Sequence, residues 1–195
     1  DRIVAVDANP DRGTLAERVD RQTRATVRDV VAKAGSIGGF TDFSAYVSRD
    51  ETRLDILASD PDPHLSEAFD ADDYNVVASL AARYYSIVLT DCGTGIVHSV
   101  MRATLERADS VVINPHKWLG AVFDCSLFYV RDPQHLVRVM STSPSYLRTA
   151  TDDTATNYRD WGIALGRRVR ALKLWRPWDA EHTGLGAPRR PPAVA

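Results

Sequence analysis

Residues 86–113, SIVLTDCGTGIVHSVMRATLERADSVVI, decide the fold of this chain. They begin with a nearly all-apolar run that ends in an aspartate (86–91), pass through a glycine-containing turn into a helical pattern (93–108), and end in a second β-branched run (109–113). A strand, a helix and a strand in this order predict a right-handed crossover between parallel strands. Because residues 86–91 are almost all apolar, we expect this strand to lie in the centre of the sheet, buried on both faces.

The same alternation of strands and helices continues toward the N-terminus. Residues 2–7 and 53–59 are short β-branched runs that predict two further strands. Residues 14–33 favour a helix that a glycine-rich break ends, and residues 70–85 favour another, whose acidic first turn suits the positive end of the helix dipole. The pattern therefore predicts an α/β fold in which the strands of residues 2–113 form one parallel, doubly wound sheet.

The composition of the 195-residue chain argues against several classes of function. Its 44% apolar and 26% charged residues are typical of soluble globular domains, and no apolar run is long enough to span a membrane. The formal net charge of −2 gives no electrostatic reason to expect nucleic acid or an anionic membrane as a partner. Cys92 and Cys125 lie in apolar surroundings without metal-ligand spacing, so we expect reduced core residues, no metal site and a cytoplasmic protein.

Three polar residues fall at or just beyond the ends of predicted strands, namely Asp7, Asp91 and Lys117. In doubly wound sheets, ligands bind outside the carboxyl ends of the strands. These residues are therefore candidates for a binding site. Both aspartates have a simpler alternative, because an aspartate at a strand end often caps the turn that follows it.

Beyond the last of these strands the regular alternation stops. Residues 125–132 predict a strand and residues 133–140 a short helix. The polar segment 141–157 has no periodicity, which is typical of a functional loop or of a disordered one. Residues 158–175 predict a loop that leads into an amphipathic helix. The proline-rich residues 176–195 predict a disordered tail.

Four motifs within residues 109–175, in their order and spacing, resemble the group II pyridoxal-phosphate-dependent decarboxylases, the family of the aromatic L-amino-acid decarboxylases. The motifs are NPHKWL, FDCS, SPSYL and YRDWGIALGRRVRALKLW. The resemblance implies that Lys117 is the Schiff-base lysine, that Asn114 helps to hold the cofactor phosphate, and that His116 lines the same pocket. It also implies that Tyr146, on a mobile loop, protonates the carbanion left by decarboxylation.

The residue types suit the chemistry that this resemblance implies. An amine must lose its proton to attack an aldehyde, and burial lowers the pKa of an ammonium group, so we expect Lys117 to lie against an apolar wall. The cofactor would act as the electron sink, and a tyrosine on a closing lid could deliver a proton once water is excluded. The simpler alternatives are a surface lysine at Lys117, an ordinary loop tyrosine at Tyr146 and a satisfied polar residue at His116.

The resemblance further implies a fold of type I among pyridoxal-phosphate enzymes, an amino-acid substrate, and a homodimer if the assembly of the family is retained. In that family an aspartate pairs with the ring nitrogen of the cofactor; it ends a strand, and a helix and another strand lead from it to the lysine. Here Asp91 ends a strand, a helix over about 97–107 and a strand over 109–113 follow, and Lys117 comes next. We therefore hypothesise that Asp91 is a surrogate partner of the ring nitrogen.

Residues 1–113 resemble a different family, the MinD/ParA-like P-loop ATPases. Residues 2–19 are similar to the strand and turn that follow the phosphate-binding helix there, and residues 84–113 to the Walker B strand, its switch turn and the next helix and strand. This resemblance implies that Asp91 is the Walker B carboxylate and that Asp7 lies near the nucleotide phosphates. The sequence does not contain the glycine-rich loop with its lysine, so we do not expect ATP to bind.

The two resemblances predict a chain of three parts. These are a MinD/ParA-like α/β segment (1–113), a decarboxylase segment (114–175) and a disordered tail (176–195), with the first two fused within the stretch ERADSVVI (106–113). By resemblance, the function is that of a pyridoxal-phosphate-dependent decarboxylase fragment, although the motifs that the family has upstream are missing. The alternatives are a partner-binding protein related to MinD/ParA-like ATPases and an inactive chimera.

Overall fold

A computed structural model of this chain describes residues 2–10, 13–20, 22–93, 97–118, 120–141, 157–162 and 173–175. The chain falls into two compact units, Asp1–Arg107 and Ala108–Ala195, which are described one at a time. The division between them lies inside the stretch ERADSVVI at which a fusion was predicted.

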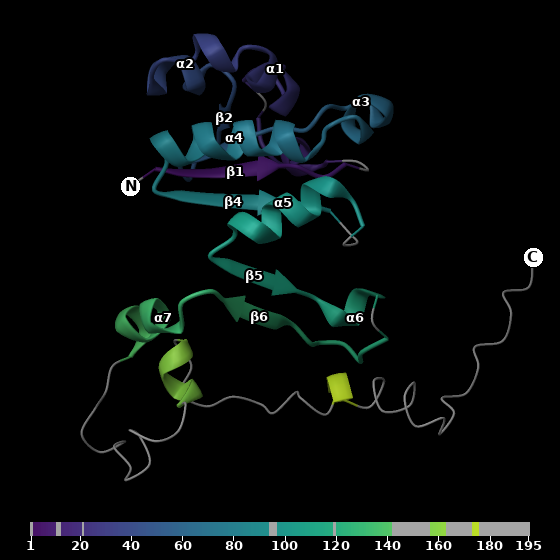
Figure 1. Cartoon of the computed structure of the whole chain (residues 1–195), viewed down its shortest axis with the longest axis vertical. Helices are drawn as coiled ribbons and strands as arrows, with labels where there is room; N and C mark the ends of the chain where they lie inside the picture. Colours follow the sequence, from purple (N-terminus) through teal and green to yellow (C-terminus); the bar gives the residue numbers. More distant parts are fainter. Residues whose placement is uncertain are drawn as a thin grey trace, which may run out of the picture. The chain divides into compact units, whose positions relative to one another are not determined.

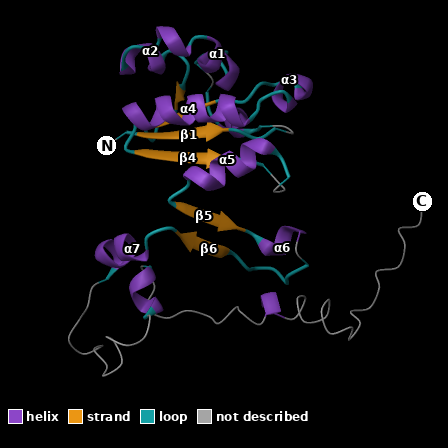
Figure 2. Ribbon diagram, viewed as in Figure 1, coloured by secondary structure: helices purple, strands orange, loops and turns teal. Residues whose placement is uncertain are grey.

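The first unit contains a four-stranded sheet in the order β2-β3-β1-β4. Its strands are β1 (Ile3–Asp7), β2 (Ser48–Arg49), β3 (Leu54–Leu57) and β4 (Ile87–Asp91). Figure 2 shows β1 and β4 side by side and pointing the same way. β1 pairs in parallel with both β3 and β4, so the predicted α/β class with a parallel sheet is confirmed. The short antiparallel strand β2, which extends the edge of the sheet beside β3, was not predicted.

The predicted central position of β4 is wrong, because β4 is the last strand in this order, whereas β3 and β1 each have a neighbour on both sides. β1 is buried from Val4 to Asp7, whereas exposed and half-buried positions alternate along β4. Ile87 is 47% exposed and Leu89 is 52% exposed. An apolar run does not reveal which strands will pair beside it, and β4 has a partner in this sheet along one edge alone among the described residues.

Helices pack around this sheet, as Figure 1 shows. They are η1 (Leu15–Arg18), α1 (Val27–Ala32), η2 (Ala34–Ser36), α2 (Phe40–Ser44), α3 (Pro63–Glu67), α4 (Ala71–Tyr84) and α5 (Ser99–Arg107). α4 confirms the helix predicted over residues 70–85. The carboxylate of Asp70 accepts hydrogen bonds from the backbone N–H groups of Asp72 at 2.9 Å and Asp73 at 3.0 Å, which explains why the helix begins there.

The single helix predicted over residues 14–33 is wrong. The chain forms the short turn η1 (Leu15–Arg18), Thr26 bridges in parallel to Ala58, and α1 begins only at Val27. The Asp29 carboxylate accepts a hydrogen bond from the Thr26 N–H at 2.8 Å, and the Val27 N–H donates to the Ala58 carbonyl at 2.8 Å. Pairing beside β3 satisfies this backbone and delays the start of the helix.

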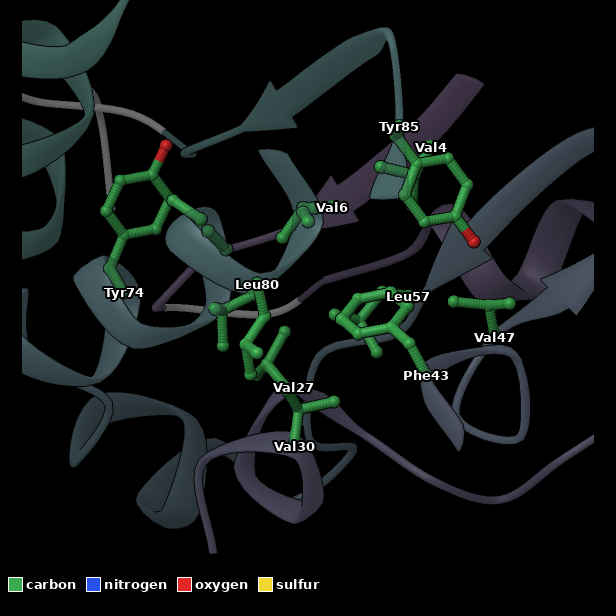
Figure 3. Close-up of a cluster of buried hydrophobic side chains, with 14 of the residues drawn as sticks. Val4, Val6, Val27, Val30, Phe43, Val47, Leu57, Tyr74, Leu80 and Tyr85 are labelled. Atoms are coloured by element: carbon green, nitrogen blue, oxygen red, sulfur yellow. The ribbon is translucent and has the colours of Figure 1, made fainter. Parts of the chain in front are cut away.

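The core of the first unit lies among β1, β3 and the helices (Figure 3). Val4 and Val6 of β1, Leu57 of β3 and Phe43 of α2 are all at most 1% exposed. The Phe43 ring lies 5.8 Å from the ring of Tyr84 and 5.7 Å from that of Tyr85, measured between centroids. The α4 helix packs against α1 and α5, so the apolar stripe of α4 closes this core.

Asp55, in the middle of β3, is a buried carboxylate within the same unit. It accepts two hydrogen bonds from the Arg49 guanidinium, at 2.6 and 2.9 Å, and one from the Tyr85 hydroxyl at 2.7 Å. Burial of the Tyr85 ring, with the neighbouring Asp55 carboxylate, raises the pKa of the Tyr85 hydroxyl far above its usual range. The three side chains form a satisfied network, which is what a buried charge requires.

The second unit is built on an antiparallel ribbon of β5 (Ser110–Ile113) and β6 (Leu127–Val130). The prediction that residues 109–113 join the parallel sheet is therefore wrong, because β5 pairs with β6 in a separate sheet. The described residues also form α6 (Pro115–Trp118), α7 (Pro133–Met140) and η4 (Tyr158–Trp161). β6 and α7 confirm the strand and the helix predicted for residues 125–132 and 133–140.

Ala108 and Asp109 are the two residues between α5 and β5. The Arg131 side chain donates to the Ala108 carbonyl at 3.0 and 3.2 Å, and the Arg131 N–H donates to the Asp109 carbonyl at 2.8 Å. Both peptide carbonyls are thus bonded to the chain just after β6.

Across the part of the chain that the structure describes, no helix combines the length and apolar character needed to cross a membrane.

Candidate functional site

The turn after β5 places Asn114, His116 and Lys117 together. The backbone N–H of Lys117 donates to the Asn114 carbonyl at 3.0 Å, which closes the single turn of α6. Pro115 is buried and Lys117 is exposed. Residues two positions apart in an α-helix are separated by about 200° around its axis. Because Pro115 is buried, position 117 lies on the opposite side of the turn.

The expected burial of Lys117 against an apolar wall is therefore wrong. Among the described residues, the Lys117 ammonium group has no hydrogen-bond or ion-pair partner. Its amine is accessible to a molecule that arrives from solvent.

Asn114 is held by a residue of the opposite strand. The Ser126 hydroxyl donates a hydrogen bond to Asn114 Oδ1 at 2.6 Å. Since this bond occupies the oxygen of the Asn114 amide, the NH₂ group of the same amide is the part that can donate to a ligand.

His116 is held by the neighbouring Cys125. His116 Nδ1 lies 2.6 Å from the Cys125 carbonyl oxygen and 3.2 Å from the Cys125 backbone nitrogen. A carbonyl oxygen can only accept, so the shorter contact requires a proton on Nδ1, and the acceptor of the neutral ring is then Nε2. The Phe123 ring packs edge-on against the imidazole, with centroids 4.9 Å apart.

Lys173 differs from Lys117 because its amine is fully engaged. Lys173 Nζ donates to the Phe123 carbonyl at 3.1 Å, to the Asp124 carbonyl at 3.4 Å and to the Asp124 carboxylate at 3.3 Å. These bonds hold the loop whose Phe123 contacts His116. The two lysines of this unit thus have opposite chemical availability.

Asp91 and Asp7 lie at the carboxyl ends of β4 and β1, where they are partners in register. Asp91 is exposed, and its carboxylate accepts from the Gly93 N–H at 3.2 Å. Asp91 belongs to the first unit and Lys117 to the second, so the pairing of Asp91 with a cofactor ring nitrogen stays a prediction.

Asp7 is buried, and its carboxylate accepts from the backbone N–H groups of Leu15 at 3.0 Å and Asn9 at 3.4 Å. Burial, its largest cause, raises the pKa of Asp7. A side chain at Gly13 would collide with this carboxylate and with Ser59. These bonds agree with the alternative in which Asp7 holds the turn after its strand.

Tyr146, the predicted proton donor, lies outside the described residues. Within the described ranges, no group of three or more His, Cys, Asp or Glu side chains could hold a metal ion. A cleft of about 990 Å³ opens in the first unit, lined in part by Glu17, Asp20, Asp50 and Glu51, and none of the predicted site residues that the structure describes lines it.

The residues that sequence reasoning missed are Ser126 and Cys125, which fix Asn114 and His116. Both belong to the FDCS motif, which the sequence shows, although the sequence alone does not show that the motif holds Asn114 and His116. The register of the ribbon holds the signal: Ile113 pairs with Leu127, and continuing that register outward by one residue brings Asn114 opposite Ser126.

Comparison with known proteins places the chain near the decarboxylases. A sequence model of the pyridoxal-dependent decarboxylase conserved domain matches residues 95–185. The chain is 48% identical over 71 residues to the aromatic-L-amino-acid decarboxylase of Drosophila melanogaster, covering 36% of this chain and 14% of that protein. It is 37% identical over 119 residues to tryptophan decarboxylase TDC1 of Camptotheca acuminata, covering 58% of this chain and 22% of that protein.

A different kind of relative also matches. The ESX-1 secretion-associated protein EspI of Mycobacterium tuberculosis (strain ATCC 25618 / H37Rv) is 35% identical over 113 residues, covering 58% of this chain and 17% of EspI. The chain therefore spans less than a quarter of the length of these curated relatives.

Two solved structures are similar to the chain. The Oryza sativa TDC structure with PLP and tryptamine has a TM-score of 0.53 and 21% identity over 92% of this chain and 39% of that one, a likeness of fold. A ParA family ATPase from Chlorobium tepidum TLS has a TM-score of 0.49 and 19% identity, over 55% of this chain and 45% of that one.

The predicted resemblance of the C-terminal part to aromatic amino-acid decarboxylases is confirmed by these matches. The residues around Lys117 also fit pyridoxal phosphate chemically, because they offer a primary amine for its aldehyde and an amide NH₂ group for its phosphate. Residues 95–185 thus match the pyridoxal-dependent decarboxylases, and pyridoxal phosphate is the cofactor that this match supports.

Proposed function

We propose that the second unit is a fragment of a pyridoxal-phosphate-dependent decarboxylase of aromatic or related L-amino acids, with Lys117 as the residue that bonds to the cofactor. The observation that supports this most is the contrast within one turn. Lys117 has an amine without a partner among the described residues, while Asn114 and His116 beside it are each held by the segment 125–126. A residue that bonds covalently to a ligand needs an available reactive group and neighbouring side chains that are fixed in position.

Each residue of the turn has a role in this proposal. The Lys117 amine would attack the aldehyde carbon, Asn114 would donate its amide N–H to the phosphate, and His116 would line the pocket. Bound pyridoxal phosphate supplies the electron sink for the electron pair that remains when CO₂ leaves an amino acid. Tyr146 would deliver the proton that replaces the carboxyl group, and Asp91 would pair with the ring nitrogen.

We further propose that the chain joins segments of two ancestries. We propose that it is cytoplasmic and, where the decarboxylase assembly is retained, dimeric. The division between the units inside ERADSVVI supports a joint there, and the matches to both decarboxylases and EspI support two ancestries. The second candidate function is a partner-binding role related to MinD/ParA-like ATPases. The four-stranded sheet with Asp7 and Asp91 in register at its carboxyl edge favours it.

The test is reductive labelling of the purified chain with pyridoxal phosphate and borohydride, followed by peptide mass mapping. The chain has three lysines, Lys33, Lys117 and Lys173. Selective labelling of Lys117 is the expected result, with exposed Lys33 as the internal measure of unspecific reaction. Equal labelling of Lys33 and Lys117, or none, would contradict the proposal.

Activity is tested separately from cofactor bonding. The chain is incubated with pyridoxal phosphate and L-tryptophan, L-tyrosine or L-DOPA, and the released CO₂ and amine product are measured. Amine formation supports a working decarboxylase. Selective labelling of Lys117 without amine formation identifies an inactive fragment that retains the binding turn.

A further inference from the structure

Ser126 is the residue just before β6, and it reaches across the ribbon to the site. Ile113 and Leu127 are the last register pair of β5 and β6, so Asn114 and Ser126 continue the ribbon by one pair. The hydrogen bond from the Ser126 hydroxyl to Asn114 Oδ1, at 2.6 Å, joins that pair through the side chains. Cross-strand pairs of this kind fix the orientation of the groups that they join.

In the structure the bond holds the Asn114 amide in one of its two orientations, with Oδ1 toward the serine. A planar amide has its oxygen and its NH₂ group on opposite sides, and rotation by 180° exchanges them. With the oxygen bonded to Ser126, the NH₂ group faces away from the serine. In the reverse orientation the amide would present its oxygen to an incoming anion and repel it.

The contact between Cys125 and His116 likewise holds a side chain of the turn. The Cys125 carbonyl lies 2.6 Å from His116 Nδ1 and holds the imidazole, so adjacent residues of one segment fix two side chains of the turn. Neither Ser126 nor Cys125 contributes the reactive amine. The segment acts on the site through Asn114 and His116.

We infer that Ser126 is a positioning residue for phosphate binding: its hydroxyl holds the Asn114 amide by the oxygen, which leaves the NH₂ group to donate to the phosphate of pyridoxal phosphate. This inference rests on the proposed function, and it adds that recognition of the phosphate depends on a residue that does not touch the cofactor. Without Ser126 the amide is free to rotate, and the charge-assisted hydrogen bond to a phosphate oxygen would be weakened or lost.

The experiment compares two aldehydes on the full chain. Pyridoxal phosphate and pyridoxal, which lacks the phosphate, are titrated separately, reduced with borohydride, and the modification of Lys117 is mapped by mass. The ratio of the two half-saturating concentrations measures recognition of the phosphate. In the unchanged chain we expect pyridoxal phosphate to label Lys117 at a concentration roughly tenfold lower than pyridoxal, as one charge-assisted bond implies.

Ser126→Ala should reduce this preference several-fold and leave labelling by pyridoxal unchanged. Ser126→Thr, which keeps a hydroxyl, should retain the preference. In an Asn114→Ala background, Ser126→Ala should have no further effect, because the group that it positions is gone.

Each other outcome has a definite meaning. If Ser126→Ala weakens labelling by both aldehydes equally, Ser126 only supports the structure of the turn and the inference is wrong. An unchanged preference in Ser126→Ala, or no preference in the unchanged chain, also overturns it. If Lys117 is not labelled selectively by either aldehyde, the proposed function itself fails.

Discussion

The buried carboxylate of the first unit and the exposed amine of the second differ in how much of their bonding capacity the protein itself uses. Asp55 accepts hydrogen bonds from Arg49 and Tyr85, so its carboxylate is bonded by side chains of its own unit. Lys117 has no partner for its amine among the described residues. Buried polar groups must be satisfied within the protein, so a reactive group that is exposed and unpaired is the one available to a ligand.

The largest expected effect concerns Lys117. Lys117→Ala should abolish the selective labelling by pyridoxal phosphate and borohydride, because it removes the only amine of the turn. Lys173→Ala, at a lysine whose amine has three acceptors, should leave labelling at position 117 intact. If Lys117→Ala takes up as much label as the unchanged chain, now at Lys33 or Lys173, the selective labelling does not come from the chemical availability of Lys117.

The next effect concerns the core of the first unit. Phe43→Ala should lower the free energy of unfolding by about 3–5 kcal/mol, because Phe43 is 0% exposed and packs against two tyrosine rings. Urea denaturation followed by tyrosine fluorescence measures this. Val139→Ala, at a residue of the second unit that is 76% exposed, is the control and should change stability by less than about 0.5 kcal/mol.

A smaller effect is expected for the Asp55 network. Tyr85→Phe removes one hydrogen bond to a buried charge and should lower the free energy of unfolding by about 1.5–3 kcal/mol at pH 7. Tyr84→Phe is the matched control on the neighbouring residue. Equal effects of the two substitutions would show that the bond from Tyr85 to Asp55 contributes no more to stability than any tyrosine hydroxyl.

The same network predicts a dependence on alkaline pH. The pKa of Tyr85 is raised in the folded chain, so above about pH 10 the unfolded chain releases this proton while the folded chain keeps it. The folded state then binds more protons, and stability falls as pH rises, by at most about 1.4 kcal/mol per pH unit. Tyr85→Phe should remove this part of the slope between pH 10 and 11.5; parallel slopes for the two chains would contradict the raised pKa.

The smallest effect is expected on β4. Leu89 is 52% exposed, so Leu89→Ala should cost less than about 1 kcal/mol, whereas Leu57→Ala, at a residue that is 0% exposed, should cost about 2–5 kcal/mol. Chemical denaturation of both variants gives the difference. A loss above 2 kcal/mol for Leu89→Ala would mean that this face of β4 is covered in solution.

Sequence reasoning found the α/β class, α4, α7 and the decarboxylase motifs because each depends on residues close together in the chain. It misplaced β4 and β5 because an apolar run does not record which strands will lie beside it. It extended one helix over residues 14–33 because the pairing of Thr26 with Ala58 is a contact between distant segments.

The candidate site shows the same division. Asn114, His116 and Lys117 follow one another closely, and a single turn brings them together. Ser126 reaches Asn114 only through the register of β5 and β6, which the sequence does not state. The exposure of Lys117 likewise follows from the burial of Pro115, a fact about packing.

The short passage from α5 to β5 has a practical consequence for separating the two units. A protease cleaves a segment that can become extended over several residues in its active site. Ala108 and Asp109 offer two residues, and the carbonyls of both are bonded to Arg131. Limited proteolysis is therefore expected to spare this passage. The halves must be obtained by ending one gene after Arg107 and beginning another at Ala108.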